Sequence, residues 1–109
     1  MTRPAEDPEV LQLLDAWSTF DLGLRLGEGF QQTKWEALQQ ALKRCKEVWS
    51  ERDHLPRPAM SALVDMFAAT EACAGIYQDG QRKQIQDLAY ALQELIQDCI
   101  WTPDMDQGT

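Results

Sequence analysis

The sequence predicts an all-α protein, folded as a four-helix antiparallel bundle-like domain that is dimeric. Four segments repeat apolar residues at steps of three and four, which is the helical period. Proline or glycine residues lie between these segments. No two segments alternate apolar and polar residues as paired β-strands would. Helices of about 20 residues with short connections favour antiparallel neighbours in an up-down-up-down order, so residues 1–109 are expected to form a single domain.

The first predicted helix spans about residues 8–27. Asp7 suits its N-cap and Pro8 its first turn, where the missing N–H costs nothing. The stretch DLGLRLGEGF follows, but its glycines do not form the G-x-G-x-x-G of a dinucleotide loop, and no second strand exists to pair with it. We therefore expect Gly27 or Gly29 to end this helix. The apolar seam is Val10, Leu13, Leu14, Trp17, Phe20 and Leu24.

The second predicted helix spans about residues 33–52. Thr33 and Glu36 have the spacing of a capping box, in which each side chain accepts a hydrogen bond from a backbone N–H at the helix start. The sequence DHLPRP then reads as a linker, because each proline disfavours helix at the residue before it. The seam of this helix is Trp35, Leu38, Leu42, Cys45 and Trp49.

The third and fourth predicted helices span about residues 58–79 and 81–100, followed by a polar tail at 102–109. Pro58 can open the third helix, and Gly80 has the features of a left-handed C-cap. The fourth helix carries a seam of Ile85, Leu88, Leu92, Leu95, Ile96 and Cys99.

Composition excludes several classes of protein. The net charge of −8 disfavours nucleic-acid binding, which depends on neutralising phosphates. No apolar run approaches 18 residues and no signal pattern opens the chain, so we expect a cytoplasmic protein without a membrane span. Charge is uneven, with net values of −4 over residues 1–28, +2 over 29–57 and −6 over 58–109. The three cysteines are odd in number and lie on apolar seams, which indicates core positions rather than disulfides.

More faces are apolar than a single small bundle needs. In the third helix Met60, Leu63, Val64 and Phe67 make one face, and a helix apolar nearly all round is buried on several sides. Either this helix is central or a second chain covers it, and a symmetric homodimer is the favoured closure. Trp101 can instead fold back on the core. The residues expected at a dimer or partner interface are Leu11, Leu22, Leu26, Met66, Tyr77, Tyr90 and Trp101.

No catalytic, cofactor or metal motif is evident, so the protein is not expected to be an enzyme. Glu51 and His54 have an E-x-x-H spacing, but one histidine cannot supply a di-iron site. Glu71 is predicted to lie in an apolar sector, where it can act with Gln39 and Lys46 in a small helical enzyme or form a salt bridge with Lys46 at the core edge.

These observations predict a small acidic regulator that binds another protein and sequesters or inhibits it. A transcription regulator is a suitable target, because such proteins are basic where they meet DNA and often dimerise through apolar faces. The antiactivator-like mechanism is occlusion of the dimerisation or DNA-binding surface. The alternatives are a secretion chaperone or toxin-immunity protein, and a small all-helical enzyme that uses Glu71.

Overall fold

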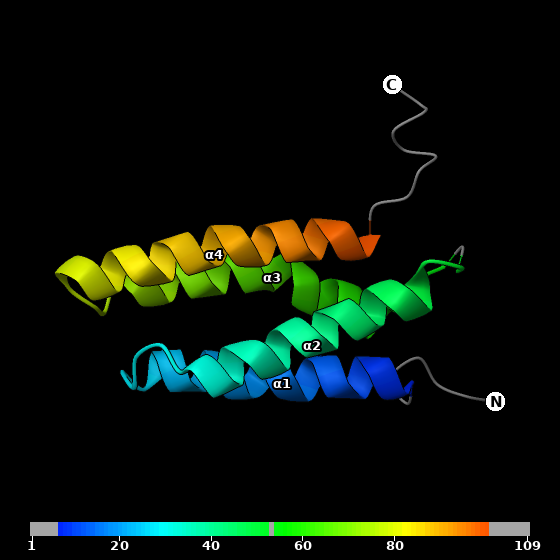
Figure 1. Ribbon diagram of the computed structural model, residues 1–109, viewed down its shortest axis with the longest axis horizontal. Helices are drawn as coiled ribbons and strands as arrows, with labels where there is room; N and C mark the ends of the chain where they lie inside the picture. Colours follow the sequence, from blue (N-terminus) through cyan, green and yellow to red (C-terminus); the bar gives the residue numbers. More distant parts are fainter. Residues whose placement is uncertain (1–6, 53, 101–109) are drawn as a thin grey trace, which may run out of the picture.

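Residues 7–52 and 54–100 are described by a computed structural model, and within them the chain forms four α-helices and no strand, which confirms the all-α prediction. The helices are α1 (Pro8–Arg25), α2 (Gln32–Trp49), α3 (Arg57–Ala74) and α4 (Asp79–Ile100). Successive helices run in opposite directions, so α1 and α3 point the same way (Figure 1).

The helices pack as two stacked hairpins. α1 contacts α2, α3 contacts α4, and the hairpins meet where α1 lies against α3 and α2 against α4. Over the described residues, the Cα atoms of α2 and α3, and those of α1 and α4, do not approach within 8 Å, so these pairs lie diagonally across the bundle. Helix α3 is therefore not central, because only two helices cover it and one side faces outward. A central position in the fold therefore does not explain why α3 is apolar on several faces.

The core lies between the hairpins and takes side chains from all four helices. Leu13, Leu38, Met66 and Leu92 are fully buried, one from each helix. Burying a side chain of this size contributes about 1.5–3 kcal/mol relative to exposure. The three cysteines are buried and free, which confirms their predicted core positions.

Helix α1 ends through the glycines of the following loop. The Gly27 N–H donates to the Leu24 carbonyl at 3.1 Å, and the Glu28 N–H donates to the Gly23 carbonyl at 3.0 Å. These two hydrogen bonds together form a Schellman motif, which needs a residue in the left-handed conformation after the C-cap. Gly27 has φ +77° and Gly29 has φ +79°, so the predicted role of these glycines is confirmed.

The predicted capping box at the start of α2 is wrong. The helix begins at Gln32, and its N-cap residue Gln31 makes no side-chain hydrogen bond to the backbone. Glu36 instead accepts a hydrogen bond from the Gln32 side chain at 3.2 Å.

Helix α3 ends at Ala74, five residues earlier than predicted, because Tyr77 is drawn into the protein. The Tyr77 hydroxyl donates to the Leu24 carbonyl and accepts from the Gly29 N–H, both at 2.9 Å. These bonds tie the α3–α4 loop to the end of α1. Gly80 is not the C-cap but lies in α4, and Asp79 takes the left-handed conformation with φ 52°.

The opposite end of the first hairpin is closed by an ion pair. Arg52, after α2, contacts the carboxylate of Glu9 at 3.1 Å and that of Asp7 at 3.3 Å. Glu9 is buried, so the guanidinium compensates a carboxylate that has little access to water.

Candidate protein-binding surface

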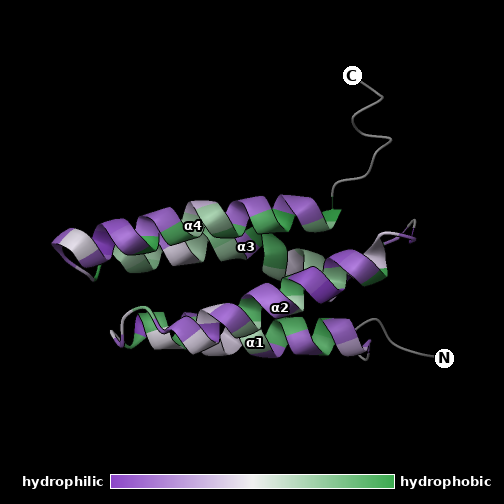
Figure 2. Ribbon diagram, in the orientation of Figure 1, coloured by the Kyte–Doolittle hydropathy of each residue, from purple (hydrophilic) through white to green (hydrophobic). Residues whose placement is uncertain are grey.

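Helices α1 and α3 differ from α2 and α4 in how polarity is distributed around them. Both α2 and α4 are strongly amphipathic, whereas α1 and α3 are weakly amphipathic and more apolar on average. The visible sides of α2 and α4 accordingly show much hydrophilic surface (Figure 2). Because α1 packs beside α3, the fold joins the surplus apolar groups of two helices that are not consecutive in the chain.

Large apolar side chains are exposed where α1 and α3 end. The exposed fractions are 56% for Leu22, 63% for Leu26 and 57% for Ile76. The Tyr77 hydrogen bonds hold the ends of these helices together, so all three side chains lie at one end of the bundle. Leu11, on the first half of α1, is 51% exposed. Single exposed leucines are ordinary, but several on adjoining elements indicate a contact surface.

A hollow of about 230 Å³ lies at the same end of the bundle, next to Ile76. Its walls are Arg25 from α1 and, from α3 and its C-terminus, Ala69, Ala72, Cys73 and Ile76. The small alanine side chains create the space, and Arg25 borders it while its Nε donates to the Asp21 carboxylate at 2.8 Å. We refer to Leu22, Arg25, Leu26, Ala69, Ala72 and Ile76 as the α1–α3 surface.

Charge also separates the two helix pairs. Helices α1 and α3 together carry five acidic and two basic residues, whereas α2 and α4 carry six of each. On α1 and α3 the exposed carboxylates include Asp15, Asp65 and Glu71. None of the ion pairs within residues 7–52 and 54–100 involves these three carboxylates. The two helices that carry the α1–α3 surface thus have an excess of acidic side chains.

A second, smaller apolar area lies on the other side of α3. Tyr90 of α4 is 59% exposed and packs against Phe67 of α3, with ring centroids 5.3 Å apart. Val64, one turn before Phe67, is 78% exposed. We refer to Val64, Phe67 and Tyr90 as the α3–α4 edge.

The structure separates the expected interface residues into two groups. Leu11, Leu22, Leu26 and Tyr90 are exposed as expected. Met66 and Tyr77 are not, and this corrects their assignment: Met66 faces the core, and the Tyr77 ring is held inward by its hydroxyl. Trp101 lies outside the described residues.

Sequence reasoning missed Val64, Ile76 and Ile100, all of which are exposed. Val64 was grouped with Met60, Leu63 and Phe67 on one apolar face, and the structure divides that group, because Leu63 is buried and Val64 is exposed. Ile76 was missed because the helix was expected to continue past it. The glycine at position 75 is the signal that could have placed the helix end before it.

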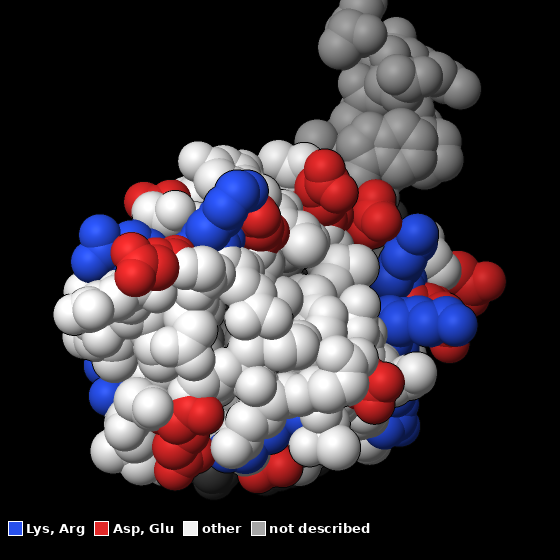
Figure 3. All heavy atoms as spheres, turned by 60° about the vertical axis from the view of Figure 1, so that its left-hand side comes forward, with Lys and Arg blue, Asp and Glu red and all other residues white. Residues whose placement is uncertain are grey.

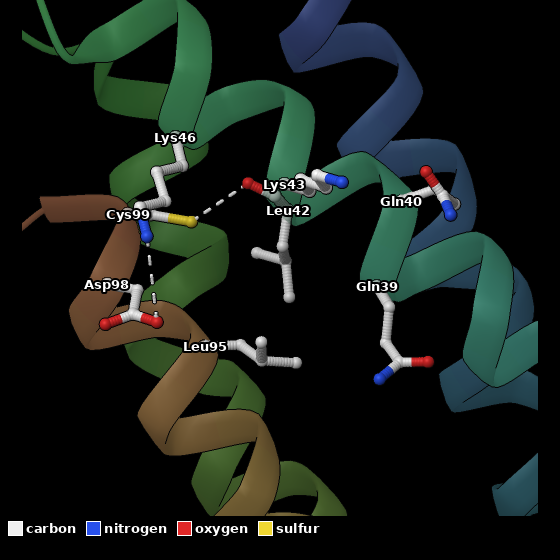
Figure 4. Close-up of a pocket in the computed structure, with 8 residues that line it drawn as sticks. All are labelled: Gln39, Gln40, Leu42, Lys43, Lys46, Leu95, Asp98 and Cys99. Atoms are coloured by element: carbon white, nitrogen blue, oxygen red, sulfur yellow. Dashed lines mark hydrogen bonds and ion pairs between the residues drawn. The ribbon is translucent and has the colours of Figure 1, made fainter.

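The predicted placement of Glu71 in an apolar sector is also wrong. Its side chain is exposed, and Lys46 lies 4.0 Å from Asp98 rather than near Glu71. Lys46 and Asp98 border a groove of about 400 Å³ between α2 and α4, with Leu42, Leu95 and Cys99 at its floor (Figure 4). This groove and the α1–α3 surface lie on different helix pairs.

The buried thiols are poor nucleophiles. Burial raises the pKa of Cys45 from 9.0 to about 12, with a further contribution from neighbouring Cys99. Burial likewise raises the pKa of Cys99 to about 11, and its thiol donates to the Leu42 carbonyl at 3.1 Å. At neutral pH both sulfurs are therefore protonated and act as packing groups.

Among the described residues, no group of three or more His, Cys, Asp and Glu side chains is placed to hold a metal ion. None of the described helices combines the length and hydropathy that crossing a membrane requires.

Figure 3 brings forward the end of the bundle that holds the α1–α2 and α3–α4 loops. Uncharged side chains cover the middle of that view, and charged ones lie around it.

Comparison of the chain with protein-family models, curated proteins and solved structures gave no match.

Proposed function

We propose that this protein is a small acidic regulator that binds another protein through the α1–α3 surface and performs no catalysis itself. The observation that carries the proposal is the side-by-side packing of the two weakly amphipathic helices, which brings the exposed side chains of Leu22, Leu26 and Ile76 to one end of the bundle, where Ile76 lines a hollow. Folding alone needs one apolar stripe per helix, so this second stripe has another use. Interfaces of this kind bury an apolar centre inside a polar rim.

We further propose that the partner is a cytoplasmic transcription regulator. Such a protein offers an apolar dimerisation face and basic DNA-contacting segments, which complement the apolar surface and the acidic excess of α1 and α3. The mechanism is antiactivator-like: binding covers the dimerisation or DNA-binding surface of the regulator, so the regulator no longer engages its operator.

Affinity capture from the native cell followed by mass spectrometry tests the proposal. We expect Leu22→Arg to lose the captured protein, because a cation replaces an apolar contact in the surface. The matched control is Gln86→Arg on the exposed face of α4, which should capture as well as the wild type. Equal capture by both variants would contradict the assigned surface.

The identity of the captured protein separates the alternatives. A secreted protein would support a secretion chaperone, and a toxin would support an immunity protein, both binding at the same surface. An enzyme that uses Glu71 has less support, because the exposed Glu71 side chain does not converge with Gln39 and Lys46.

We also propose that the protein forms a homodimer through the α3–α4 edge. Tyrosine and phenylalanine are enriched in such contacts, and a two-fold axis would place Tyr90 of each copy against the other. Light scattering after size exclusion should give a dimer for the wild type and a monomer for Tyr90→Lys. A monomeric wild-type chain would contradict this proposal and leave the α1–α3 surface unaffected.

A further inference from the structure

We infer that residues 101–106 of this chain, which follow the described part of α4, dock in the groove between α2 and α4 and cover it. The groove belongs to the other helix pair than the α1–α3 surface, so this docking does not depend on the proposed function. The position of the groove, its lining and the pattern of the residues after α4 support it.

The groove lies where α4 ends. Asp98 and Cys99, in the last turn of α4, border it, and the helix ends one residue later at Ile100. From there the groove extends back to Leu95, which lies about 6 Å before Cys99 at a rise of about 1.5 Å per residue. Six extended residues span about 20 Å. Residues 101–106 are therefore long enough to reverse direction and run back along the groove.

The floor of the groove is apolar and incompletely covered by the bundle. Leu42 from α2 and Leu95 from α4 point into the space between the two helices (Figure 4). Leu95 belongs to the predicted seam of α4, yet it stays partly exposed, whereas its seam neighbours Leu92 and Ile96 are buried. The groove volume of about 400 Å³ is large enough to receive apolar side chains. An apolar contact is thus left open at this point of the bundle.

The residues after α4 have the pattern of an extended segment that suits this floor. Pro103 disfavours helix at Thr102, so the helical period of α4 is not expected to continue. Apolar and polar residues then alternate, with Trp101, Pro103 and Met105 in one set and Thr102, Asp104 and Asp106 in the other. Successive side chains of an extended segment point to opposite sides. One side of this segment is therefore apolar and the other side is acidic.

Charge complementarity favours the same segment. Lys43 and Lys46 border the groove on the α2 side, and none of the ion pairs formed by residues 7–52 and 54–100 includes Lys43. Lys46 lies 4.0 Å from Asp98, and both side chains are more than half exposed, so this pair is weak. Two lysines and one aspartate give the groove lining a net charge of +1, whereas residues 101–106 carry −2.

Tethering selects this segment over an occupant from another molecule. A segment joined to its site by a short linker has an effective concentration on the order of millimolar. A second copy of the chain offers the same residues only at the protein concentration of the solution. Any external ligand of the groove would therefore have to displace residues 101–106, which act as an internal competitor.

Paramagnetic broadening tests the docking in the full chain. The native thiols are buried, so a nitroxide attaches selectively to the cysteine introduced by Gln107→Cys, just after the docked segment. Amide NMR of the ¹⁵N-labelled protein then reports which residues lie near the nitroxide. We expect broadening at Gln39 and Lys43 of α2, which are far from position 107 in sequence, and little broadening at Leu22 or Ala72.

Matched variants separate docking from the nearness that the tether alone imposes. Trp101→Gln with Met105→Gln keeps the length and charge of the segment but removes two apolar side chains, so the broadening on α2 should fall several-fold. Lys43→Glu should also reduce this broadening at low salt, because it removes a cation that faces the acidic side of the segment. Lys83→Glu, the same change at the exposed start of α4, should leave the broadening unchanged.

Four results would overturn the inference. Absence of broadening on α2 would show that the groove stays open, and equal broadening in the Trp101→Gln and Met105→Gln double variant would show that the tether alone places the nitroxide there. Equal effects of Lys43→Glu and Lys83→Glu would remove the charge complementarity that selects this segment.

The fourth result comes from a mixture of ¹⁵N-labelled protein without nitroxide and spin-labelled protein without ¹⁵N. Broadening in this mixture as strong as that within one chain would show that the segment of a second copy occupies the groove. The proposed function stands in all four cases, because its own test uses Leu22→Arg on the other helix pair.

Discussion

The α1–α3 pair and the α2–α4 pair contribute to one core but have different outer faces. Helices α2 and α4 each present one main apolar stripe inward, although α4 also exposes Tyr90 and Ile100, and their charges are balanced at six acidic and six basic residues. Helices α1 and α3 fill the core equally well, yet keep Leu22, Leu26 and Val64 exposed. The difference shows that core formation does not explain the composition of α1 and α3, and this is the physical basis for proposing that they bind another protein.

The largest expected effect on the free energy of unfolding is at the side of α3 that faces the core. Met66→Ala should lower the free energy of unfolding by about 2–5 kcal/mol, because it leaves a cavity at a fully buried site. Val64→Ala, two residues away, should change it by less than about 0.5 kcal/mol because Val64 is exposed. Urea unfolding measures both, and similar losses would mean that α3 is buried on both sides.

The tie between the two loops should have the next largest effect. Tyr77→Phe removes the hydroxyl and leaves the Leu24 carbonyl and the Gly29 N–H without their partner. We expect a loss of about 1–3 kcal/mol in the free energy of unfolding. Amide exchange should also speed up at Gly29. An unchanged unfolding midpoint would show that the loops do not depend on this tyrosine.

Alkaline pH should weaken the packing around α2, where the Cys45 thiol donates to the Glu9 carbonyl of α1 and the Cys99 thiol of α4 donates to the Leu42 carbonyl. Folding raises the pKa of Cys45 to about 12 and that of Cys99 to about 11, so the folded state holds these protons more tightly than the unfolded state. The resulting stability is complete below pH about 9 and declines as pH rises towards 11. We expect the urea midpoint to fall between pH 8.5 and pH 10.5.

Cysteine variants supply the control for that prediction. Cys45→Ala should reduce the dependence of the midpoint on pH more than Cys73→Ala does. Burial raises the pKa of both thiols, but Cys45 is fully buried whereas Cys73 keeps an exposed fraction of 7%. Titration of tyrosine and lysine is common to all variants and cancels in the comparison. Identical pH profiles for Cys45→Ala and the wild type would contradict the assignment.

The smallest effect on stability is expected at the α1–α3 surface. The triple change Leu22→Gln, Leu26→Gln and Ile76→Gln should alter the free energy of unfolding by less than about 1 kcal/mol, because all three side chains are more than half exposed. The same variant should bind less of a hydrophobic fluorescent dye than the wild type. A large loss of stability would place these residues in the core and contradict the difference between the outer faces of the two helix pairs.

Sequence patterns predicted the helices and most of the core because both depend on local periodicity. The period of three and four identified Leu38 and Leu92 as core, and Asp7 and Gly27 marked the ends of α1. Periodicity also separated Leu22 and Leu26 from the core side of α1. It failed at Met66, which was expected at an interface, because α3 is apolar on nearly every side and its neighbours decide which side faces the core.

The pairing of α1 with α3 was not accessible from the sequence. Short connections predict antiparallel neighbours, yet the Cα atoms of α2 and α3, which are consecutive, do not approach within 8 Å in the described residues. The hydroxyl of Tyr77 has partners 48 and 53 residues away, and no local pattern reports such a contact. The combined surface follows from that pairing, and so does the hollow.

The hairpin arrangement has a consequence for how this chain can be divided. Within the described residues no Cα atom of α2 lies within 8 Å of one in α3, and the first hairpin is closed at one end by its own loop and at the other by Arg52 with Glu9. The connection near Leu55 therefore joins the two hairpins, which meet through the contacts of α1 with α3 and of α2 with α4. A chain cut at this connection retains every helix-to-helix contact, so its two halves form a natural pair for fragment complementation, in which reassembly would rebuild the α1–α3 surface from separate molecules.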